Sequence, residues 1–290
     1  MDAFHSFWSY PNAIRNNGKI GFPDFELLTA ILSALSWKKH NGSITMVTDS
    51  SGAAFFHAMM LDGLWDTITT TLDRVETEID PYFFWAAGKL YALRSMPTPC
   101  VMLDTDLIIW KEVTGLEDWD VIAAHPEGLY PDVYPDISTF TLKGDFKFPG
   151  NWDFTLEAAN TAFLYLKNRE FRDQYVDHAI SFFKHLDTKD MNPVTAMCFA
   201  EQRVLPMCAR EEKQKLAYLF NLQDAATQDL ATHTWGYKVL LRTDPAEHHR
   251  FCMTCVRKIM QDYPEAKKFL TGPVLLPYLE EYQASITVLN

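Results

Sequence analysis

The first half of the sequence alternates short apolar runs rich in β-forming residues with longer segments of helical periodicity. The predicted strands span residues 4–10, 43–48, 66–72, 100–103, 107–110 and 121–124, and the predicted helices begin at Asp24, Ala53 and Asp80. Strands that alternate with amphipathic helices pair side by side, and the helices then cover the faces of the sheet. The pattern therefore predicts an α/β fold with a central, mostly parallel sheet flanked by helices.

The second half is less regular. Residues 125–153 carry prolines, glycines and aromatic residues without a clear period, which is typical of a lid or a binding loop. Beyond this loop we expect a strand at 161–166, helices at 170–186 and 193–205, an extended segment near 218–222, and a helical tail from Pro245 onward. Because no repeat or linker divides the chain, we expect a single domain with a helical C-terminal tail.

Composition and charge exclude several classes of protein. The formal charge is −12, from 38 acidic and 26 basic residues, so no net field attracts a phosphate backbone and we expect no nucleic-acid partner. No apolar run approaches the roughly 18 residues that span a bilayer, and the first residues lack the basic segment of a secretion signal. Five cysteines, an odd number, favour a reducing compartment. We therefore predict a cytoplasmic protein, with peripheral membrane association left open.

Two acidic residues, Asp104 and Asp106, interrupt a buried strand in the segment CVMLDTDLIIW. A carboxylate taken out of water without a partner is costly. Residues i and i+2 of a strand face the same way, so these two carboxylates can converge on one point. The spacing suits a hard divalent ion that keeps positions open for phosphate oxygens. We predict a metal site here rather than an exposed acidic turn at the end of a strand.

Two further charged residues lie beside the predicted strands. Lys89 is the only charged residue of the apolar segment 82–93. It either extends along its stem to solvent or meets the two aspartates or a substrate phosphate. Asp49 follows the strand 43–48, at the sheet edge where open α/β proteins bind ligands, or it simply caps the next helix. Both residues are candidates for ligand binding.

Three residues of the second half are candidates for substrate positioning or acid–base chemistry. Asn160 stands at the entry of the predicted strand 161–166, where its amide could orient a substrate or make a turn. Glu201 falls on an otherwise apolar helix stripe, which suits either a perturbed carboxyl group or a paired structural residue. Its neighbour Gln202 is the alternative residue to face a cleft.

The segment HTWGYK contains, within six positions, three residues that suit ligand binding. His233 is a possible imidazole ligand, Gly236 allows close approach of a ligand, and Lys238 suits a phosphate. The other interpretation is a glycine turn that an aromatic residue anchors to the core.

A nearby run of histidines and cysteines resembles a zinc motif at first sight. His248, Cys252 and Cys255 share one face of a predicted helix. Three or four ligands from two helical turns would crowd one tetrahedral ion, and no second cysteine pair lies nearby. We therefore favour a half-buried structural face here.

In order along the chain, the segments ITMVTD, WAAGKLYAL and CVMLDTDLIIW resemble glycosyltransferases of the GT-A fold, with a weaker similarity at NTAFLYL. In that family a DxD motif holds a divalent metal against the diphosphate of a sugar nucleotide. The resemblance covers roughly residues 4–125. It implies a Rossmann-like catalytic domain at 1–245, with a nucleotide-binding half at about 1–125 and an acceptor half at about 126–245, and a helical extension at 246–290 packed on it.

The resemblance also implies roles for single residues. Asp104 would contact the ribose or the metal, Asp106 would bind the metal, and Lys89 matches the basic residue often found on the helix before DxD. HTWGYK is similar to the H-x-x-G-x-x-K element of retaining enzymes such as glycogenin and the bacterial lipopolysaccharide galactosyltransferases. There the histidine completes the metal shell and the lysine holds the diphosphate. In this chain the spacing from glycine to lysine is one residue shorter.

The implied function is metal-dependent transfer of a sugar from a nucleotide-diphosphate sugar to a carbohydrate, lipid-linked or protein acceptor. The expected donor is a UDP-sugar and the expected cofactor is Mn²⁺ or Mg²⁺. The expected catalytic residues are Glu201, Gln202 and Asn160; the expected donor-binding residues are Lys89, Asp49, Asp104, Lys238 and Gly236; the expected metal ligands are Asp104, Asp106 and His233.

Two other functions remain as alternatives. One is a nucleotidyltransferase on a similar sheet, although the segment FHSFWSYPNAIRNNGK has only one glycine where such enzymes carry a glycine-rich phosphate loop. The other is a carbohydrate-binding or scaffold protein that keeps the fold without catalysis. Retention or inversion at the sugar stays open.

Overall fold

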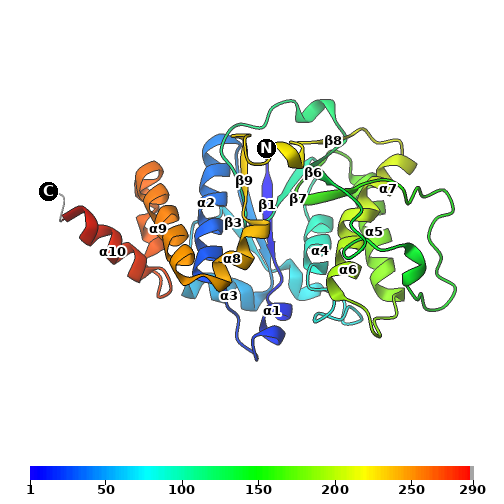
Figure 1. Cartoon of the computed structure of the whole chain (residues 1–290), viewed down its shortest axis with the longest axis horizontal. Helices are drawn as coiled ribbons and strands as arrows, with labels where there is room; N and C mark the ends of the chain where they lie inside the picture. The colour runs from blue at the N-terminus through cyan, green and yellow to red at the C-terminus, as the bar shows by residue number, and fades with distance from the viewer. Residues whose placement is uncertain (288–290) are drawn as a thin grey trace.

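Seven strands form the central sheet of the computed structural model, which describes residues 1–287 (Figure 1). In spatial order they are β3 (Thr67–Thr69), β2 (Ile44–Thr48), β1 (Ala3–Phe7), β4 (Cys100–Leu103), β7 (Ala158–Leu166), β6 (Val121–Glu127) and β8 (Leu216–Tyr218). Neighbouring strands pair in parallel except at β7, which is antiparallel to β4 and β6. A second, antiparallel pair consists of β5 (Leu107–Ile109) and β9 (Ala231–His233). The predicted α/β fold with a mostly parallel sheet is confirmed.

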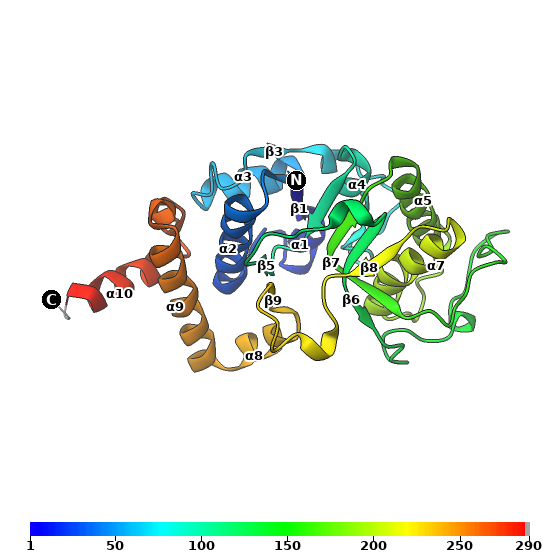
Figure 2. The same ribbon diagram turned by 90° about the horizontal axis from the view of Figure 1, so that it is seen from above.

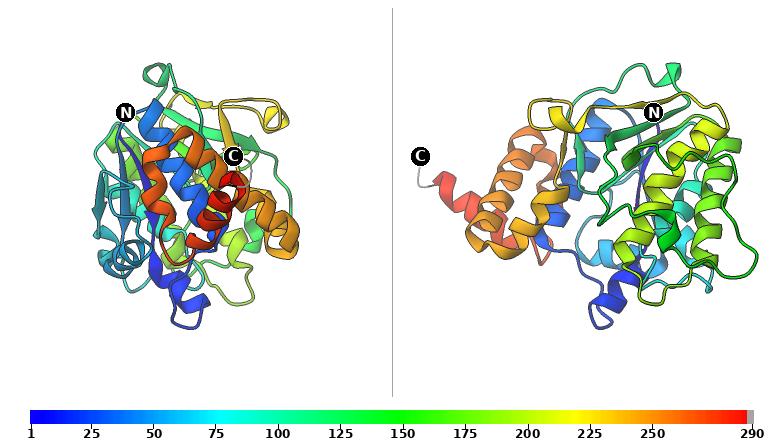
Figure 3. Two further views of the ribbon diagram at one scale, coloured as in Figure 1. Left: turned by 90° about the vertical axis from the view of Figure 1, so that its left-hand side faces the viewer. Right: turned by 45° about the vertical axis from the view of Figure 1, so that its right-hand side comes forward.

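Helices cover both faces of this sheet (Figure 2). On one face lie α2 (Asp24–His40) and, outside it, α9 (Pro245–Asp262) and α10 (Leu276–Thr287), which Figure 3 shows at one end of the molecule. On the other face lie α4 (Ala87–Ser95), α5 (Arg169–His185), α6 (Pro193–Cys198) and α7 (Val204–Glu211). The short helices are α1 (Ser9–Arg15), α3 (Ser50–Ala58) and α8 (Lys238–Thr243). Short 3₁₀ helices span Thr71–Arg74, Leu116–Asp118, Ile137–Thr139, Leu222–Asp224, Trp235–Tyr237 and Pro264–Leu270.

The C-terminal helices form the tail that the sequence predicts. The last three residues of the predicted extension 246–290 lie outside the described residues, and its division from 1–245 stays a prediction. Within residues 1–287, the helices are too short or too polar to cross a bilayer.

Two hydrophobic cores sandwich the sheet because successive strand residues point to opposite faces. In β1, Ala3 packs in the core beneath α2 and α9, whereas Phe4 packs in the core beneath α4 and α5. In β4, Val101 and Met102 divide in the same way. This sandwich holds the carboxyl ends of β1, β2 and β4 at one edge of the sheet, where the polar residues lie.

Several element boundaries differ from the sequence expectation, among them the end of the first strand and the start of the helix expected from Asp80. The first strand ends at Phe7 rather than at residue 10, because the chain turns into α1, where the Ser9 N–H donates to the Asp49 carboxylate at 2.9 Å. The helix expected from Asp80 begins only at Ala87. Between them Asp80 accepts hydrogen bonds from two backbone N–H groups of a turn whose phenylalanines, Phe83 and Phe84, are buried in the core.

Candidate active site

Asp104 and Asp106 lie in the turn that joins β4 to β5. The Asp104 N–H donates to the Ala162 carbonyl of β7 at 2.7 Å, and the Leu107 N–H closes the turn on the Asp104 carbonyl at 3.0 Å. From α2, the Ser33 hydroxyl donates to the Leu107 carbonyl at 2.6 Å. The two carboxylates are therefore held at the end of a central strand by three neighbouring elements.

Strand pairing brings His233 to the same place from a distant part of the sequence. His233 is the partner of Leu107 in the β5–β9 ladder, and the Thr234 N–H donates to the Asp106 carbonyl at 3.1 Å. Ligand atoms of Asp104, Asp106 and His233 all lie within 4.8 Å of one another. Within residues 1–287, the buried Nδ1 atom of His233 has no hydrogen-bond partner. Two carboxylates and an imidazole with an unpartnered nitrogen fit a divalent cation.

Each of the two aspartates also forms an ion pair with a lysine. Lys89 Nζ, from α4, lies 2.7 Å from Asp104 Oδ1 and 2.9 Å from Glu201 Oε1. Lys238 Nζ, from the first residue of α8, lies 2.9 Å from Asp106 Oδ2. Lys89 thus meets a carboxylate rather than bulk solvent, and Lys238 reaches the aspartate pair despite the shortened spacing from Gly236.

Burial and the neighbouring lysines determine the pKa values of Asp104, Asp106 and His233. Burial raises the pKa of Asp104 to about 6, although Lys89 opposes the shift. Burial also disfavours the Asp106 carboxylate, but Lys238 and His233 outweigh it and hold its pKa below the usual range. Burial lowers the pKa of His233 to about 4, so this imidazole is neutral at physiological pH. Neutral imidazole is the form that binds metals.

Glu201 and Gln202 lie in a π-helical turn, Phe199–Arg203, between α6 and α7. Pro206 explains this widening, because a proline lacks the N–H for the carbonyl four residues earlier and its ring clashes with that carbonyl in a regular helix. Glu201 is buried, and its Oε1 accepts from the Thr161 hydroxyl at 2.5 Å as well as from Lys89. Such π turns often occur at functional sites.

A second buried network joins Asn160 to Gln202. The Asn160 amide donates to Glu127 Oε1 at 2.6 Å, and the Tyr134 hydroxyl donates to Glu127 Oε2 at 2.6 Å. The Tyr134 hydroxyl also contacts the Gln202 amide oxygen. Asn160 and Gln202 are sequence candidates, whereas Glu127 and Tyr134 are not.

Sequence reasoning misses Glu127 because Pro126 indicates the start of a loop. In the structure, β6 passes through an irregularity between Ala123 and His125 and continues to Glu127. Prolines inside sheets are tolerated next to such bulges. The available signal is an acidic residue close behind a buried apolar strand, the same signal that marks Asp104.

Two cavities open beside these residues, and Trp8 lines both. The first, of about 560 Å³, is lined by Lys89, Glu201, Trp85 and Trp235 among others. The second, of about 500 Å³, is lined by the following polar and aromatic residues among others: Ser9, Tyr10, Asp49 and Ser51. Trp8 stands close to α4 because Gly88 has no side chain there; a Cβ on Gly88 would lie 2.5 Å from the Cβ of Trp8.

Asp49 and Gly236, the remaining candidates, have simple local environments. The Asp49 carboxylate caps α3 by accepting from the Gly52 N–H at 2.7 Å, and it accepts from the Ser9 hydroxyl at 2.6 Å. Asp49 therefore caps a helix, which confirms one of the two sequence interpretations, and it also lines a cavity, whereas ligand binding by Asp49 stays a prediction. No atom among the described residues lies within 4 Å of a Cβ built on Gly236, so packing within the chain does not require a glycine there.

The chain matches a protein-family model described as "Family of unknown function (DUF6734)" over residues 1–271. No curated protein matches it. Among solved structures, it is similar to the galactosyltransferase LgtC in complex with donor and acceptor sugar analogues, at 11% identity and a TM-score of 0.42 over 80% of this chain and 86% of that one. It is also similar to the apo form of mouse xyloside xylosyltransferase 1, at 11% identity and a TM-score of 0.41 over 76% and 85% of the two chains.

A third similar structure is the glycosyltransferase GlyE of Streptococcus pneumoniae TIGR4, at 11% identity and a TM-score of 0.37 over 78% of this chain and 46% of that one. All three proteins are glycosyltransferases, the class that the sequence segments resemble. At these identities and TM-scores, inference about the reaction rests on the residues of the site.

Proposed function

We propose that this chain, which belongs to the family DUF6734, is a metal-dependent glycosyltransferase that moves a sugar from a nucleotide-diphosphate sugar to a carbohydrate or glycoconjugate acceptor. One observation carries the proposal: ligand atoms of Asp104, Asp106 and His233 converge within 4.8 Å, and each aspartate also holds a lysine. Transfer from such a donor develops negative charge on the departing diphosphate. Preorganised cations at this position stabilise that charge.

Asp104, Asp106 and His233 would hold the cation, Mn²⁺ or Mg²⁺. Once bound, the ion would supply positive charge for the diphosphate oxygens. His233 is neutral and Asp106 ionised at neutral pH, so both are ready to act as ligands. Asp104, with a pKa raised to about 6 by burial, becomes fully ionised only above that value. We therefore expect metal binding to weaken as the pH falls below about 6.

Lys238 and Lys89 would contact the donor from two sides. Lys238 follows the open backbone of Gly236, where a phosphate can come close to the chain because no side chain fills the space. Lys89 lines the cavity of about 560 Å³ and already compensates two carboxylates. Because Lys89 contacts two carboxylates, a phosphate oxygen can replace one of them as its partner while the lysine stays paired with a negative charge.

The two cavities suit the two parts of the donor. The cavity of about 500 Å³, with Ser9, Tyr10 and Asp49 in its wall, has the polar groups and the aromatic face that a nucleoside needs, and we assign the uridine part of a UDP-sugar to it. The larger cavity would take the transferred sugar and the acceptor. Its walls include Trp85 and Trp235, and aromatic faces pack well on sugar rings.

Glu201, Gln202 and Asn160 are the proposed catalytic residues. The buried carboxylate of Glu201 lines the sugar cavity and is fixed by Lys89 and Thr161, so it would stabilise positive charge that develops on the sugar ring. The amides of Gln202 and Asn160 would orient sugar hydroxyl groups, because Glu127 and Tyr134 hold them in place.

The cellular setting remains a sequence prediction. The charge of −12 supports a partner other than nucleic acid. We propose a cytoplasmic enzyme with a carbohydrate, lipid-linked or protein acceptor, and peripheral contact with a membrane when the acceptor is lipid-linked.

Calorimetric titration of the purified chain with a panel of UDP- and GDP-sugars, in Mn²⁺, in Mg²⁺ and in EDTA, tests the proposal. We expect one donor to bind in the presence of metal and to lose affinity in EDTA. Asp104→Asn combined with Asp106→Asn should abolish this binding. Asp62→Asn, an exposed carboxylate paired with His57, is the matched control and should bind as the wild type does.

Product analysis separates the alternatives. Release of a nucleoside diphosphate with transfer of the sugar supports the glycosyltransferase, whereas release or consumption of pyrophosphate indicates a nucleotidyltransferase. Metal-dependent sugar binding without turnover indicates a carbohydrate-binding scaffold. A folded wild-type protein that binds none of the donors would overturn the proposal.

A further inference from the structure

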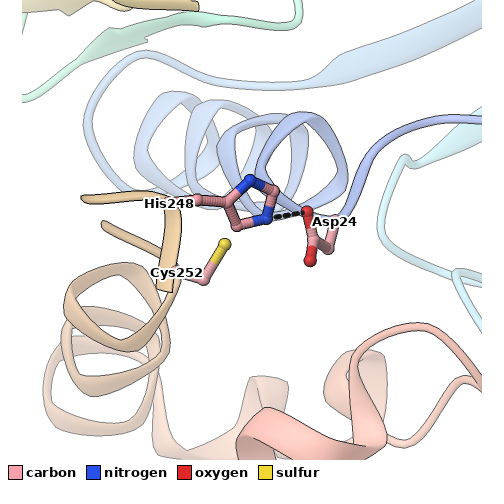
Figure 4. Close-up of side chains that lie close together, drawn as sticks. All are labelled: Asp24, His248 and Cys252. Atoms are coloured by element: carbon pink, nitrogen blue, oxygen red, sulfur yellow. Dashed lines mark hydrogen bonds and ion pairs between the residues drawn. The ribbon is translucent and has the colours of Figure 1, made fainter. Parts of the chain in front are cut away.

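A second group of metal-ligating side chains lies outside the active-site aspartates, between α2 and the C-terminal helices. Asp24 is the first residue of α2, and His248 and Cys252 stand one turn apart on α9. Figure 4 shows the three side chains pointing toward one another. Their ligand atoms all lie within 4.8 Å of one another. The proposed sugar transfer uses none of the three.

His248 is oriented as a ligand would be. Its Nδ1 atom lies 2.7 Å from the Leu241 carbonyl, so Nδ1 carries the proton and donates it there. Its Nε2 atom is thereby aimed at Asp24 Oδ1, 2.6 Å away. Histidines that bind metals hold their second ring N–H on a carbonyl or a carboxylate in this manner, which fixes both the tautomer and the ring.

Asp24 is positioned from the opposite side. Its Oδ2 accepts a hydrogen bond at 2.5 Å from the hydroxyl of Tyr278 in α10, and its Oδ1 accepts one at 2.8 Å from the Phe25 N–H. The side chains of Asp24 and His248 keep 19% and 26% of their surface exposed, so the group is open to an ion from solvent. The Cys252 side chain closes the inner side and is fully buried.

The sequence of α9 alone does not reveal this group of ligands, because one of the three lies on another helix. His248 and Cys252 share a face at i and i+4 and both belong to the group, whereas Cys255 does not. The third ligand comes instead from Asp24, far away in sequence and on another helix. Ligands from two helices approach an ion from different directions, so the crowding that argues against a zinc site on α9 alone does not arise.

We propose that Asp24, His248 and Cys252 bind one Zn²⁺ ion, with a water molecule or the Tyr278 hydroxyl as the fourth ligand. A thiolate, an imidazole and a carboxylate are the ligand types that Zn²⁺ prefers, and three protein ligands with an open fourth position are common. Binding releases two protons to solvent, that of the Cys252 thiol and the one that His248 Nε2 shares with Asp24, and it leaves His248 neutral.

The distances require only a small adjustment. Zinc bonds of about 2.0–2.3 Å place tetrahedral ligands about 3.3–3.8 Å apart. The Asp24 oxygen and the His248 nitrogen, at 2.6 Å, would separate by about 1 Å. The ligand pairs that lie farther apart, up to 4.8 Å, would draw together by a similar amount.

Zinc at this position would fasten the C-terminal helices to α2. The carbonyl that holds His248 belongs to Leu241 in α8, the helix that begins with Lys238. The ion would therefore stabilise the end of the chain that supplies a lysine to the active-site aspartates, without touching them.

Cobalt titration of the full chain, first stripped of metal with EDTA, tests the site. One equivalent of Co²⁺ should produce an intense near-ultraviolet sulfur-to-cobalt charge-transfer band, and one equivalent of Zn²⁺ should remove it. Cys252→Ser should abolish the band, and Asp24→Asn should weaken zinc binding by about 10-fold or more. Cys255→Ser, on the same helix, is the matched control and should keep the band.

The Asp104→Asn, Asp106→Asn double variant should also keep the band, which makes this test independent of the proposed sugar transfer. As a second readout, with the Asp104→Asn, Asp106→Asn double variant as the background so that Zn²⁺ does not bind the active-site group, Zn²⁺ should raise the thermal unfolding midpoint with and without Cys255→Ser but not with His248→Gln. A wild-type chain without the band, or a band that persists in Cys252→Ser, would overturn the proposal. Either outcome would leave these residues as a hydrogen-bond network that holds α9 to α2.

Discussion

Replacing Lys89 with methionine tests the electrostatics of the active site most directly. Lys89 Nζ lies 2.7 Å from Asp104 and 2.9 Å from Glu201, and the three side chains keep 22%, 22% and 8% of their surface exposed. Methionine fills similar space without charge. Removing one partner of a buried ion pair leaves the other charge uncompensated, which typically costs about 3–5 kcal/mol. We expect Lys89→Met to lower the free energy of unfolding by that amount at pH 7 in EDTA.

Urea unfolding followed by circular dichroism measures this loss. The control is Lys38→Met, because Lys38 also lies 2.7 Å from a carboxylate, Asp66, but the two side chains are 30% and 42% exposed. Exposed pairs contribute about 0–1 kcal/mol, so the control should change little. Mn²⁺ should stabilise Lys89→Met more than the wild type, because it replaces the missing positive charge at Asp104.

The pH dependence gives an independent check on the same reasoning. Lys89 opposes the rise in the pKa of Asp104, which burial already brings to about 6. Without Lys89 this pKa rises further, the folded variant binds a proton that the unfolded chain does not, and its stability increases as the pH falls. The difference from the wild type should therefore shrink between pH 7 and pH 5. A loss below about 1 kcal/mol at pH 7, or a larger loss at pH 5, would refute the buried ion-pair interpretation.

Four further predictions concern the scaffold and the residues next to the site. Burial lowers the pKa of His5 from 6.5 to about 3, so the stability that neutral His5 contributes is complete above pH 6.5 and falls toward pH 3. At pH 4.5 the wild type should have lost about 2.7 kcal/mol more of its free energy of unfolding in urea than His5→Gln. Equal losses in the two proteins would contradict this prediction. Gly88→Ala should cost about 1–3 kcal/mol in the same assay because its Cβ meets Trp8. Gly236→Ala should change stability by less than about 0.5 kcal/mol while weakening donor binding in the calorimeter, and full donor affinity would remove Gly236 from the donor site. Tyr134→Phe deprives the buried Glu127 carboxylate of a donor and should cost about 1–3 kcal/mol; a thermal midpoint equal to that of the wild type would show that water replaces the hydroxyl.

Local periodicity predicts much of the sheet because a strand that is buried on both faces has an unmistakable sequence. The segment around Asp104 shows this best: apolar residues on both sides of two acids indicate a strand end with a charged turn, and the structure has β4, a turn and β5 there. Contact between Lys89 and an aspartate is one of the two interpretations that the sequence allows, since its helix leads directly into that strand.

The other parts of the two sites depend on contacts between residues that are distant in sequence, and local sequence patterns do not predict such contacts. His233 reaches the aspartates only through the pairing of β9 with β5, and Asp24 reaches His248 only through the packing of α2 on α9. Pro126 marks a loop by every local rule, yet a bulge lets the strand continue to Glu127. Each of these depends on the tertiary structure rather than on the neighbouring residues.

The pairing of β5 with β9 sets the order in which the site is completed during synthesis. Asp106 is translated 128 residues before Thr234. At the usual rate of about 5–20 residues per second, roughly 6–26 s separate the two on the ribosome. Throughout that interval the nascent chain has its aspartates without His233 or Lys238. A chain that terminates between β5 and β9 therefore contains Asp104 and Asp106 but neither His233 nor Lys238, so its donor site is incomplete.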